Sequence, residues 1–466
     1  MLFSSIPFLY YFFPAALVLY FASPRKLKNF TLFIISLVFY GWGEPKYVFI
    51  MLASIIIGYI SGLLIEAFAD KRARRLVLIF SVLMSLGFLF YFKYTDFFIE
   101  NFNRVSGLSL PLLKIALPIG ISFYTFQILS YTVDVYRGDV RAQRNFFSLA
   151  AYISMFPQLI AGPIVRYSQI EGELSSREHS FENFAYGIRR FVLGLGKKIL
   201  IANLLGELCD VFRASGDKSV MFYWLYAAAF ALHIYFDFSG YSDMAIGLGR
   251  IFGFHFTENF NYPYISKSIT EFWRRWHISL GTWFRDYVYI PMGGNRAGRA
   301  RWFLNIFVVW MLTGFWHGAA WNFVIWGLFF AVLLIIEKLF LLRYLEKSKV
   351  LSRIYVGLAV LVSFVIFNAA DMGEAADYIG GMFGAGGIPF VSDEFFYYLK
   401  DNAAVLAAAV IGCTPLVKNL VLKLRRNSTA GKVMDFLEPA ALAVLLVVMT
   451  AFLVDGSFNP FLYFRF

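Results

Sequence analysis

Residues 302–336 read WFLNIFVVWMLTGFWHGAAWNFVIWGLFFAVLLII, two apolar stretches with one histidine, His317, between them. Each stretch approaches the length of about 20 apolar residues that crosses a bilayer. Basic residues flank the pair on both sides, at 296–301 and at 338–353. If both flanks lie in the cytoplasm, the chain must turn within or across the membrane. His317 is then expected at membrane depth, close to that turn.

The rest of the 466-residue chain has the same apolar character. It is 59% hydrophobic and only 15% charged, whereas a soluble domain carries roughly 25% charged residues. We therefore expect an all-α polytopic membrane protein that forms one domain over residues 1–466. Apolar runs that could cross or enter the membrane are 5–22, 28–42, 47–66, 75–93, 113–133, 146–165, 219–238, 302–316, 318–336, 354–370, 402–417 and 436–454.

Charged residues predict how the chain is oriented in the membrane. Basic clusters at 25–28, 71–75 and 137–144 fall on alternate connections and are expected in the cytoplasm. The acidic segment 371–401 is expected as an external loop. This arrangement predicts both termini outside, with an extracytoplasmic tail at 455–466.

Several features carry no site prediction. The formal net charge of +12 lies in short clusters between apolar runs, which disfavours nucleic-acid binding. Cys209 and Cys413 fit neither a disulfide framework nor a metal site. His179 is expected to be solvated in a polar loop, and His255 has no nearby partner of obvious purpose in the sequence. The sequence lacks the H-E-x-x-H, Walker A and G-x-S-x-G motifs, which disfavours metallohydrolases, nucleotide-driven pumps and serine hydrolases.

Two histidines near membrane segments are candidates for chemistry, because ionisable groups at membrane depth are costly and usually functional. His317 is either such a group or a structural histidine bonded to a backbone carbonyl. His277 lies in EFWRRWHISLGTWFRD, where charges alternate with tryptophans. That segment is either an amphipathic interfacial helix or a re-entrant element lining a cytoplasmic cavity. In the second case Arg274, Arg275 and Arg285 could bind phosphates.

A third polar block surrounds His233. Asp237 follows it by four residues, so the two share one helix face, and Asp243 follows in the same block. The block is either a proton relay or a buried polar network that supports a helix break at Gly240.

Five blocks of the sequence together resemble the membrane-bound O-acyltransferase (MBOAT) family. The closest likeness is to its bacterial branch, the alginate and cell-wall polysaccharide O-acetyltransferases. The resemblance runs from the N-terminus to about residue 340. The blocks are LPIGISFYTFQILSYTVDVYRGD (117–139), FPQLIAGPIVRY (156–167), YFDFSGYSDMAIGLGRIFGF (235–254), NFNYPYISKSITEFWRRWHISLGTWFRDYVYIPMGG (259–294) and TGFWHGAAWNFVIWG (313–327).

The resemblance implies a fold and an activity. The fold is a ring or funnel of roughly 10–13 transmembrane and re-entrant helices around a central tunnel. His317 matches the central catalytic histidine, and His277 matches the histidine that precedes it. The implied donor is cytoplasmic acetyl-CoA, with no bound cofactor and no metal. The implied acceptor is a polysaccharide outside the bacterial plasma (inner) membrane.

The last ten residues, SFNPFLYFRF (457–466), are similar to aromatic C-terminal motifs of this branch. That similarity implies an acyl-carrier role for Tyr463. An extracytoplasmic SGNH-hydrolase-like acetyltransferase is the implied partner that removes the acyl group. The alternative is that the tail anchors the protein in the outer aromatic belt.

We therefore predict an O-acyltransferase in which His317, assisted by His277, takes the acceptor proton and returns it to the leaving thiol. One alternative is a transporter or flippase of an acylated carrier, since broken helices and intramembrane charges also suit transport. Another is a scaffold for a secretion complex, in which both histidines would be dispensable.

Overall fold

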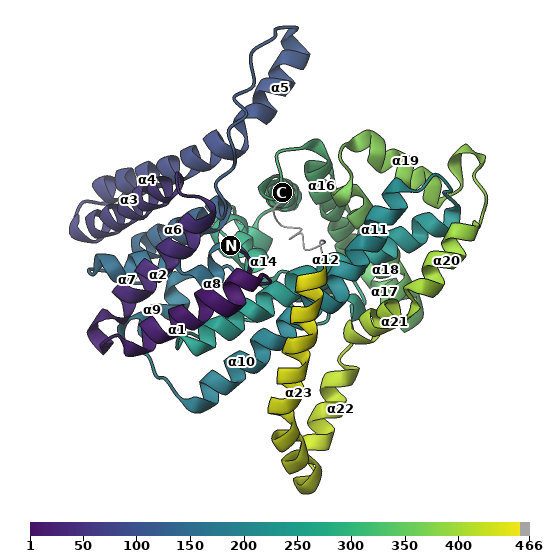
Figure 1. Cartoon of the computed structure of the whole chain (residues 1–466). Coiled ribbons are helices and arrows are strands. Elements are labelled where there is room, and N and C mark those ends of the chain that lie inside the picture. The colour runs from purple at the N-terminus through teal and green to yellow at the C-terminus, as the bar shows by residue number, and fades with distance from the viewer. Residues whose placement is uncertain (457–466) are drawn as a thin grey trace. The chain divides into compact units, whose positions relative to one another are not determined.

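The computed structural model describes residues 1–456, apart from the side chain of Ser428. Over that range the chain consists of helices and their connections, with no β-strand (Figure 1). The prediction of an all-α protein is confirmed. Tyr463 lies outside the described residues, so its acyl-carrier role stays a prediction.

The helices group into two compact units. The N-terminal unit comprises Met1–Phe191 and Ser242–Thr257, and the C-terminal unit comprises Val192–Tyr241 and the described residues from Glu258 onwards. Two helices, α10 (Phe181–Gly196) and α12 (Val220–Ile251), run from one unit into the other. Two predictions depend on how these units are arranged relative to each other. They are the single domain over residues 1–466 and the ring or funnel of helices around a tunnel, and both stay predictions.

In the N-terminal unit, α3, α4 and α6 pack against one another, and α2 packs against α7. Helix α4 begins after Asp70, whose carboxylate accepts a hydrogen bond from the Ala73 amide at 3.0 Å and so caps the helix. Helix α6 ends at Gly138, which has a left-handed φ of 82°. Besides α10 and α12, the helices are η1 (Phe8–Phe12), α1 (Phe13–Ala22), η2 (Arg25–Leu27), α2 (Lys28–Gly43), α3 (Val48–Ala67), α4 (Lys71–Lys93), α5 (Thr95–Ser106), α6 (Ile121–Arg137), α7 (Phe146–Ser154), α8 (Phe156–Leu159) and α9 (Tyr167–Ser175).

The C-terminal unit holds the remaining helices, where η denotes a 3-10 or π-helix. They are η3 (Lys197–Asn203), α11 (Leu204–Ala214), η4 (Pro263–Ile265), α13 (Ile269–Arg275), α14 (Ile278–Phe284), η5 (Arg285–Tyr289), η6 (Gly294–Arg296), α15 (Arg299–His317), α16 (Trp321–Ile336), η7 (Glu337–Leu341), α17 (Leu342–Leu345), α18 (Lys349–Asn368), α19 (Met372–Met382), η8 (Ala385–Gly387), α20 (Asp393–Asp401), α21 (Ala403–Gly412), α22 (Leu416–Arg425) and α23 (Ser428–Asp455).

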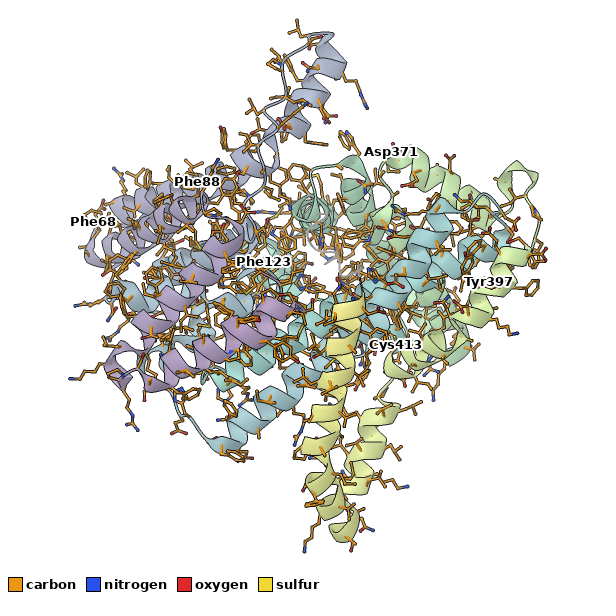
Figure 2. All side chains as sticks on the ribbon, in the orientation of Figure 1. Phe68, Phe88, Phe123, Asp371, Tyr397 and Cys413 are labelled. Atoms are coloured by element: carbon orange, nitrogen blue, oxygen red, sulfur yellow. The ribbon has the colours of Figure 1, made fainter. Side chains whose placement is uncertain are left out.

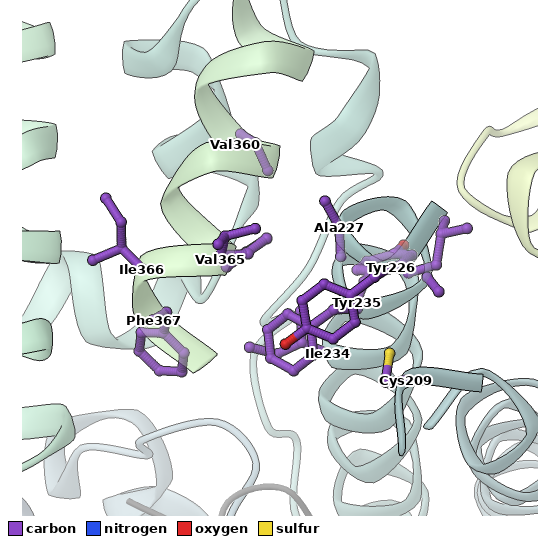
Figure 3. Close-up of a cluster of buried hydrophobic side chains, with 14 of the residues drawn as sticks. Cys209, Tyr226, Ala227, Ile234, Tyr235, Val360, Val365, Ile366 and Phe367 are labelled. Atoms are coloured by element: carbon purple, nitrogen blue, oxygen red, sulfur yellow. The ribbon is translucent and has the colours of Figure 1, made fainter. Parts of the chain in front are cut away.

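The core of the C-terminal unit is aromatic and lies along α12. Tyr226 and Tyr235 of α12 are buried in one cluster with Phe367 of α18 (Figure 3). The rings of Phe230 and Phe364 join the same two helices edge to face, with centroids 6.4 Å apart. This packing fixes α12 against α18. The segments that contain His277 and His317 lie between these two helices in the sequence.

Six described helices are long and apolar enough to cross a membrane. They are Val48–Ala67, Lys71–Lys93, Val220–Ile251, Trp321–Leu345, Lys349–Asn368 and Thr429–Asp455. The pair α21 and α22, bent by 65°, gives a seventh if it is one broken span. The chain is therefore a multi-pass membrane protein, as predicted.

Two expected spans differ from the observed helices. The stretch 146–165 is divided between α7 and α8, because Pro157 lacks the amide hydrogen that would continue the helix through this point. The stretch 113–133 becomes helical only at Ile121. Gly120 precedes it with a left-handed φ of 77°, which interrupts a helix.

Large apolar side chains cover much of the surface. Phe68, which follows α3, is 40% exposed, and Tyr397 of α20 is 64% exposed, whereas Cys413 is buried (Figure 2). Exposed apolar area on this scale is unusual for a soluble monomer and suits solvation by lipid. The acidic segment expected as an external loop contains α19 and α20, and its side of the membrane stays a prediction.

Candidate active site

His317 is the last residue of α15 and is buried, with 8% of its surface exposed. Its imidazole lies edge to face against two aromatic rings, with centroids 5.2 Å from Trp326 and 5.3 Å from Phe367. Both rings come from other helices, α16 and α18. Three helices of the C-terminal unit therefore fix the plane of this ring.

Glycines hold α15 and α16 close together beside His317. A Cβ atom on Gly314 would overlap the carbonyl oxygen of Phe323, and one on Gly327 would overlap that of Trp310. Only glycine lets the two backbones approach this closely. The T-G-F-W-H-G-A-A-W-N-F-V-I-W-G block thus encodes a tight helical hairpin with the histidine at its turn.

His277 lies between α13 and α14 in a left-handed conformation, with φ of 43°. This conformation is costly for a residue with a side chain. Hydrogen bonds between the residues that flank His277 and the segment before α13 hold this conformation. The Ile278 amide donates to the Asn259 carbonyl oxygen at 3.0 Å, and the Asn261 amide donates to the Arg275 carbonyl oxygen at 2.9 Å.

Hydrogen bonding assigns the protons on the His277 ring. The Ser279 amide, which can only donate, lies 3.2 Å from Asn259 Oδ1 and so identifies that atom as the oxygen. His277 Nδ1 lies 3.1 Å from the same oxygen and therefore donates to it. The neutral ring then carries its acceptor lone pair on Nε2, which is buried and has no hydrogen-bond partner within residues 1–456.

Burial also keeps His277 neutral. The residue is 1% exposed, and its ring lies edge to face with Phe238 at a centroid distance of 4.7 Å. Desolvation lowers the pKa of His277 to about 3, because the low-dielectric surroundings disfavour the imidazolium. At neutral pH this imidazole is an uncharged acceptor.

Trp316 connects the two predicted catalytic histidines. Its ring centroid lies 5.1 Å from that of His317 and 6.1 Å from that of His277. The structure thus brings the two histidines close to one indole, from segments 40 residues apart in the sequence.

The sequence reasoning missed Glu337, the first residue of η7, which is 1% exposed. Its carboxylate accepts hydrogen bonds from the amides that begin α13, Ile269 at 2.5 Å and Thr270 at 2.9 Å. A carboxylate satisfies amides that have no partner within the helix and interacts favourably with the helix dipole. No motif signals this contact, because the partners are nearly 70 residues apart.

The three arginines predicted to bind the donor differ in availability. Arg275 is paired with Glu271 at 2.9 Å, and Arg285 with Asp286 at 2.6 Å. Hydrogen bonding to Asp286 raises the pKa of Arg285. Arg274 is exposed and forms no ion pair within the described chain, so it alone can meet an anion without breaking an existing pair.

A second cation, Lys338, lies close enough to Arg274 for their positive charges to repel. Its Nζ also lies 5.3 Å from the centroid of the Trp302 ring. This lysine follows Glu337 directly and was predicted only as part of the basic flank 338–353, not as a binding residue. Arg274 and Lys338 together form a positive patch beside α13.

The predicted supporting network divides among separate contacts. His233 Nδ1 donates to the Ala202 carbonyl oxygen at 2.6 Å, and Asp237 pairs with Lys198 at 2.6 Å. Asp243 pairs instead with Arg190, in the N-terminal unit, also at 2.6 Å.

The expected helix break at Gly240 is wrong, since α12 is continuous from Val220 to Ile251. The glycine has a different purpose. A Cβ there would lie 2.7 Å from the Gly194 carbonyl oxygen, so Gly240 permits close packing of α12 on α10.

The remaining histidines lie in the N-terminal unit. His255 Nδ1 pairs with Glu173 at 2.5 Å, and this partner is distant in the sequence. His179 is exposed as predicted, but its Nε2 also lies 3.0 Å from the Tyr20 hydroxyl. Within residues 1–456, no group of three or more His, Cys, Asp or Glu side chains is arranged to hold a metal ion.

The sequence pattern that defines the membrane-bound O-acyltransferase family matches residues 75–369. The chain is 38% identical to the Azotobacter vinelandii protein named "Probable alginate O-acetylase AlgI" over the whole of both chains. It is 42% identical to the Pseudomonas aeruginosa protein of the same name, over 83% of this chain and 75% of the relative. It is also 31% identical to the peptidoglycan O-acetyltransferase of Helicobacter pylori, over 100% of this chain and 98% of the relative.

A multi-pass helical fold with buried histidines, together with these matches, defines an integral-membrane acyltransferase. The chain belongs to the membrane-bound O-acyltransferase family, as its sequence blocks predicted.

Proposed function

We propose that this enzyme takes an acetyl group from cytoplasmic acetyl-CoA and passes it across the bacterial plasma membrane to a hydroxyl acceptor. The acetyl group then serves the O-acetylation of an extracellular or cell-wall polysaccharide. The names of the relatives support both the acetyl group and the polysaccharide.

The observation that carries this proposal is the pair of buried histidines whose rings both lie close to the indole of Trp316. A hydroxyl is a weak nucleophile at neutral pH and needs a positioned base. His317 accepts the hydroxyl proton as the oxygen attacks the thioester carbon. The carbon–sulfur bond then breaks, the new ester forms, and the proton returns to the thiolate of CoA.

His277 acts as an orienting acceptor in this scheme. Its Nδ1 hydrogen is used by Asn259, so Nε2 can accept a hydrogen bond from the incoming hydroxyl or thiol. Because the ring is neutral and rigidly held, it fixes the position of that group without a competing positive charge.

Arg274 is the proposed first contact for the donor phosphates, with Lys338 beside it. A guanidinium binds phosphate oxygens through two parallel hydrogen bonds, and the ammonium adds charge. Arg275 and Arg285 contribute less, because each is already paired with a carboxylate.

The proposed acceptor is Tyr463, from which an extracytoplasmic SGNH-hydrolase-like partner would move the acetyl group to the polymer. The similarity of the C-terminal tail to aromatic motifs of the bacterial branch supports this step. The distribution of basic residues also predicts that both termini lie outside, which supports this step.

The test is mass spectrometry of the C-terminal peptide after incubation in nanodiscs with isotopically labelled acetyl-CoA. We expect label on Tyr463 in the wild type and none in the His317→Ala variant. His255→Ala is the matched control, because it removes a surface histidine and should keep the label. Absence of label in a preparation that still acetylates polymer would refute the tyrosine carrier.

A further inference from the structure

Four titratable side chains gather around Tyr20 in the N-terminal unit. Lys28 Nζ lies 4.4 Å from the centroid of the Tyr20 ring and donates to the Tyr20 carbonyl oxygen at 2.7 Å. Arg177 Cζ lies 5.8 Å from the same centroid, and His179 Nε2 lies 3.0 Å from the Tyr20 hydroxyl. The pKa of His179 is lowered first by partial desolvation of its ring, and then by three positive charges, those of Lys28, Arg177 and Arg25. We name these five residues the Tyr20 cluster.

Arg177 is held in place but is not neutralised. Its Cζ lies 4.5 Å from the Phe254 ring centroid, and its Nη2 donates to Asn29 Oδ1. Its Nη1 is buried and has no hydrogen-bond partner in residues 1–456. The carboxylate whose charge acts on Arg177, that of Glu173, is already bonded to His255. A buried guanidinium donor without an acceptor is costly and marks a place where an anion would bind.

In residues 1–456 no carboxylate forms an ion pair with a cation of the cluster, and Glu173 acts on Arg177 only at longer range. Within the described residues, none of Arg25, Lys28 and Arg177 forms an ion pair. Like charges this close raise the free energy of the folded protein unless an anion screens them. The fixed framework of Tyr20 carbonyl, Asn29 and aromatic rings nonetheless holds the cations together.

The chemistry of the cluster fits a phosphate group. A phosphate offers several acceptor oxygens, which can take hydrogen bonds from the Lys28 ammonium and from Nη1 of Arg177 at once. The Tyr20 hydroxyl is not one of these donors, because it already donates to the Phe252 carbonyl oxygen at 3.0 Å. Arg25 and Lys28 of the cluster belong to the basic segment 25–28, which connects α1 to α2. The charge pattern predicts that this segment lies in the cytoplasm. Basic pockets between membrane helices on that side bind anionic lipid head groups.

We propose that the Tyr20 cluster is a binding site for a phosphate group, supplied by an anionic phospholipid of the cytoplasmic leaflet. Arg177 provides the buried hydrogen-bond donor, and Lys28 and Arg25 provide the charge. The site lies wholly within the N-terminal unit and does not depend on the proposed acetyl transfer.

The experiment uses the full-length protein, delipidated in neutral detergent and then titrated with phosphatidylglycerol or with phosphatidylcholine. Native mass spectrometry counts the bound lipid. We expect saturable binding of phosphatidylglycerol, reduced about tenfold in Arg177→Gln, since a charge-assisted hydrogen bond is lost. Lys71→Gln is the matched control. It removes an exposed lysine from the start of α4, also in a segment expected in the cytoplasm, and should change affinity by less than about twofold.

Two further arms make the result decisive. The Arg177→Lys variant keeps the positive charge and should bind more phosphatidylglycerol than Arg177→Gln. If Arg177→Gln fails to fold, Lys28→Gln is the test variant used in its place. Competition with CoA and with dephospho-CoA separates the two sources of phosphate. If CoA displaces the lipid and dephospho-CoA does not, the site binds the 3′-phosphate of the donor. If neither compound displaces the lipid, the site binds the lipid phosphate. An equal loss in Arg177→Gln and Lys71→Gln would overturn the proposal.

Discussion

Glu337 accepts hydrogen bonds from both the backbone amide and the hydroxyl of Thr270, at 2.9 and 2.7 Å. The contact ties the end of α16 to the start of α13. Helix α16 begins four residues after His317, and α13 ends two residues before His277. One buried carboxylate therefore joins the two segments that carry the candidate catalytic histidines.

We expect Glu337→Gln to lower kcat for acetyl transfer on the order of tenfold, because a buried cap worth about 1–3 kcal/mol is weakened. The amide keeps the side-chain volume but loses the charge and one acceptor oxygen. Steady-state kinetics in nanodiscs would measure the effect, with protein amount checked by size-exclusion chromatography.

Glu346→Gln is the control for this variant, since Glu346 is an exposed glutamate nine residues further along. Its activity should equal that of the wild type. Equal activity in both variants would show that the cap does not position the site.

Replacing His317 by Gln separates an enzyme from a transporter. Glutamine keeps the polarity and much of the volume but cannot accept and return a proton at neutral pH. We expect the rate of acetyl transfer to fall by about 10²-fold or more. Polymer O-acetylation in cells and release of CoA in vitro are the measurements. Near-normal acetylation in this variant, with normal protein levels, would favour transport of an acylated carrier.

The class of the protein was predictable because membrane helices are encoded locally. Runs of apolar residues and clusters of Lys and Arg are visible in any window of the sequence. Where a predicted helix boundary was wrong, a single residue determined the local course of the backbone. Pro157 ends α7 within an apolar run, and Gly240 lets α12 pack closely on α10 instead of breaking it.

The site was predictable only in part, because its contacts are long-range. The two histidine motifs identify His317 and His277 as candidates, and their catalytic roles stay predictions. Nothing in the local sequence shows that both rings lie close to Trp316, or that Asn259 fixes the His277 tautomer. The pairing of Arg275 with Glu271 could have been inferred from their spacing of four residues on a helix.

The depressed pKa of His277 predicts a pH dependence of stability. In the folded protein its pKa is about 3, below the ordinary value of 6.5. Above pH 6.5 the His277 ring is neutral in both the folded and the unfolded protein, so its titration does not change the free energy of unfolding. Between pH 6.5 and about 3 only the unfolded chain binds the proton, so stability falls as the pH falls, by up to about 1.4 kcal/mol per pH unit.

Thermal unfolding at pH 7.5, 6.0 and 5.0 would measure this dependence. We expect the melting temperature of the wild type to fall more steeply with acidity than that of His277→Gln, which has no group to titrate. Parallel curves for the two proteins would contradict the assignment of a buried neutral imidazole.

The glycine contact between α15 and α16 predicts a steric effect. A methyl group at Gly314 would overlap the Phe323 carbonyl oxygen, so Gly314→Ala should separate the helices and displace His317. We expect the free energy of unfolding to fall by about 1–3 kcal/mol and the acetyl-transfer activity to fall as well. Gly357→Ala, on α18, is the control, because a Cβ there meets no atom within 4 Å. Similar melting temperatures for the two variants would refute the close approach.

The ion pair of Lys198 and Asp237 predicts opposite effects for single and double substitutions. The two groups lie 2.6 Å apart, each only 2% exposed, and Asp237 belongs to a helix long enough to cross the membrane. Asp237→Asn leaves a buried ammonium without its counter-ion and should cost about 3–5 kcal/mol, seen as a loss of folded protein. The double variant Lys198→Met with Asp237→Leu removes both charges and should recover much of that stability, because a desolvated pair contributes little net free energy. Activity then decides the role of the pair. A stable double variant that transfers acetyl normally has lost only a structural contact, whereas a stable but inactive one would show that the charges act in the transfer itself.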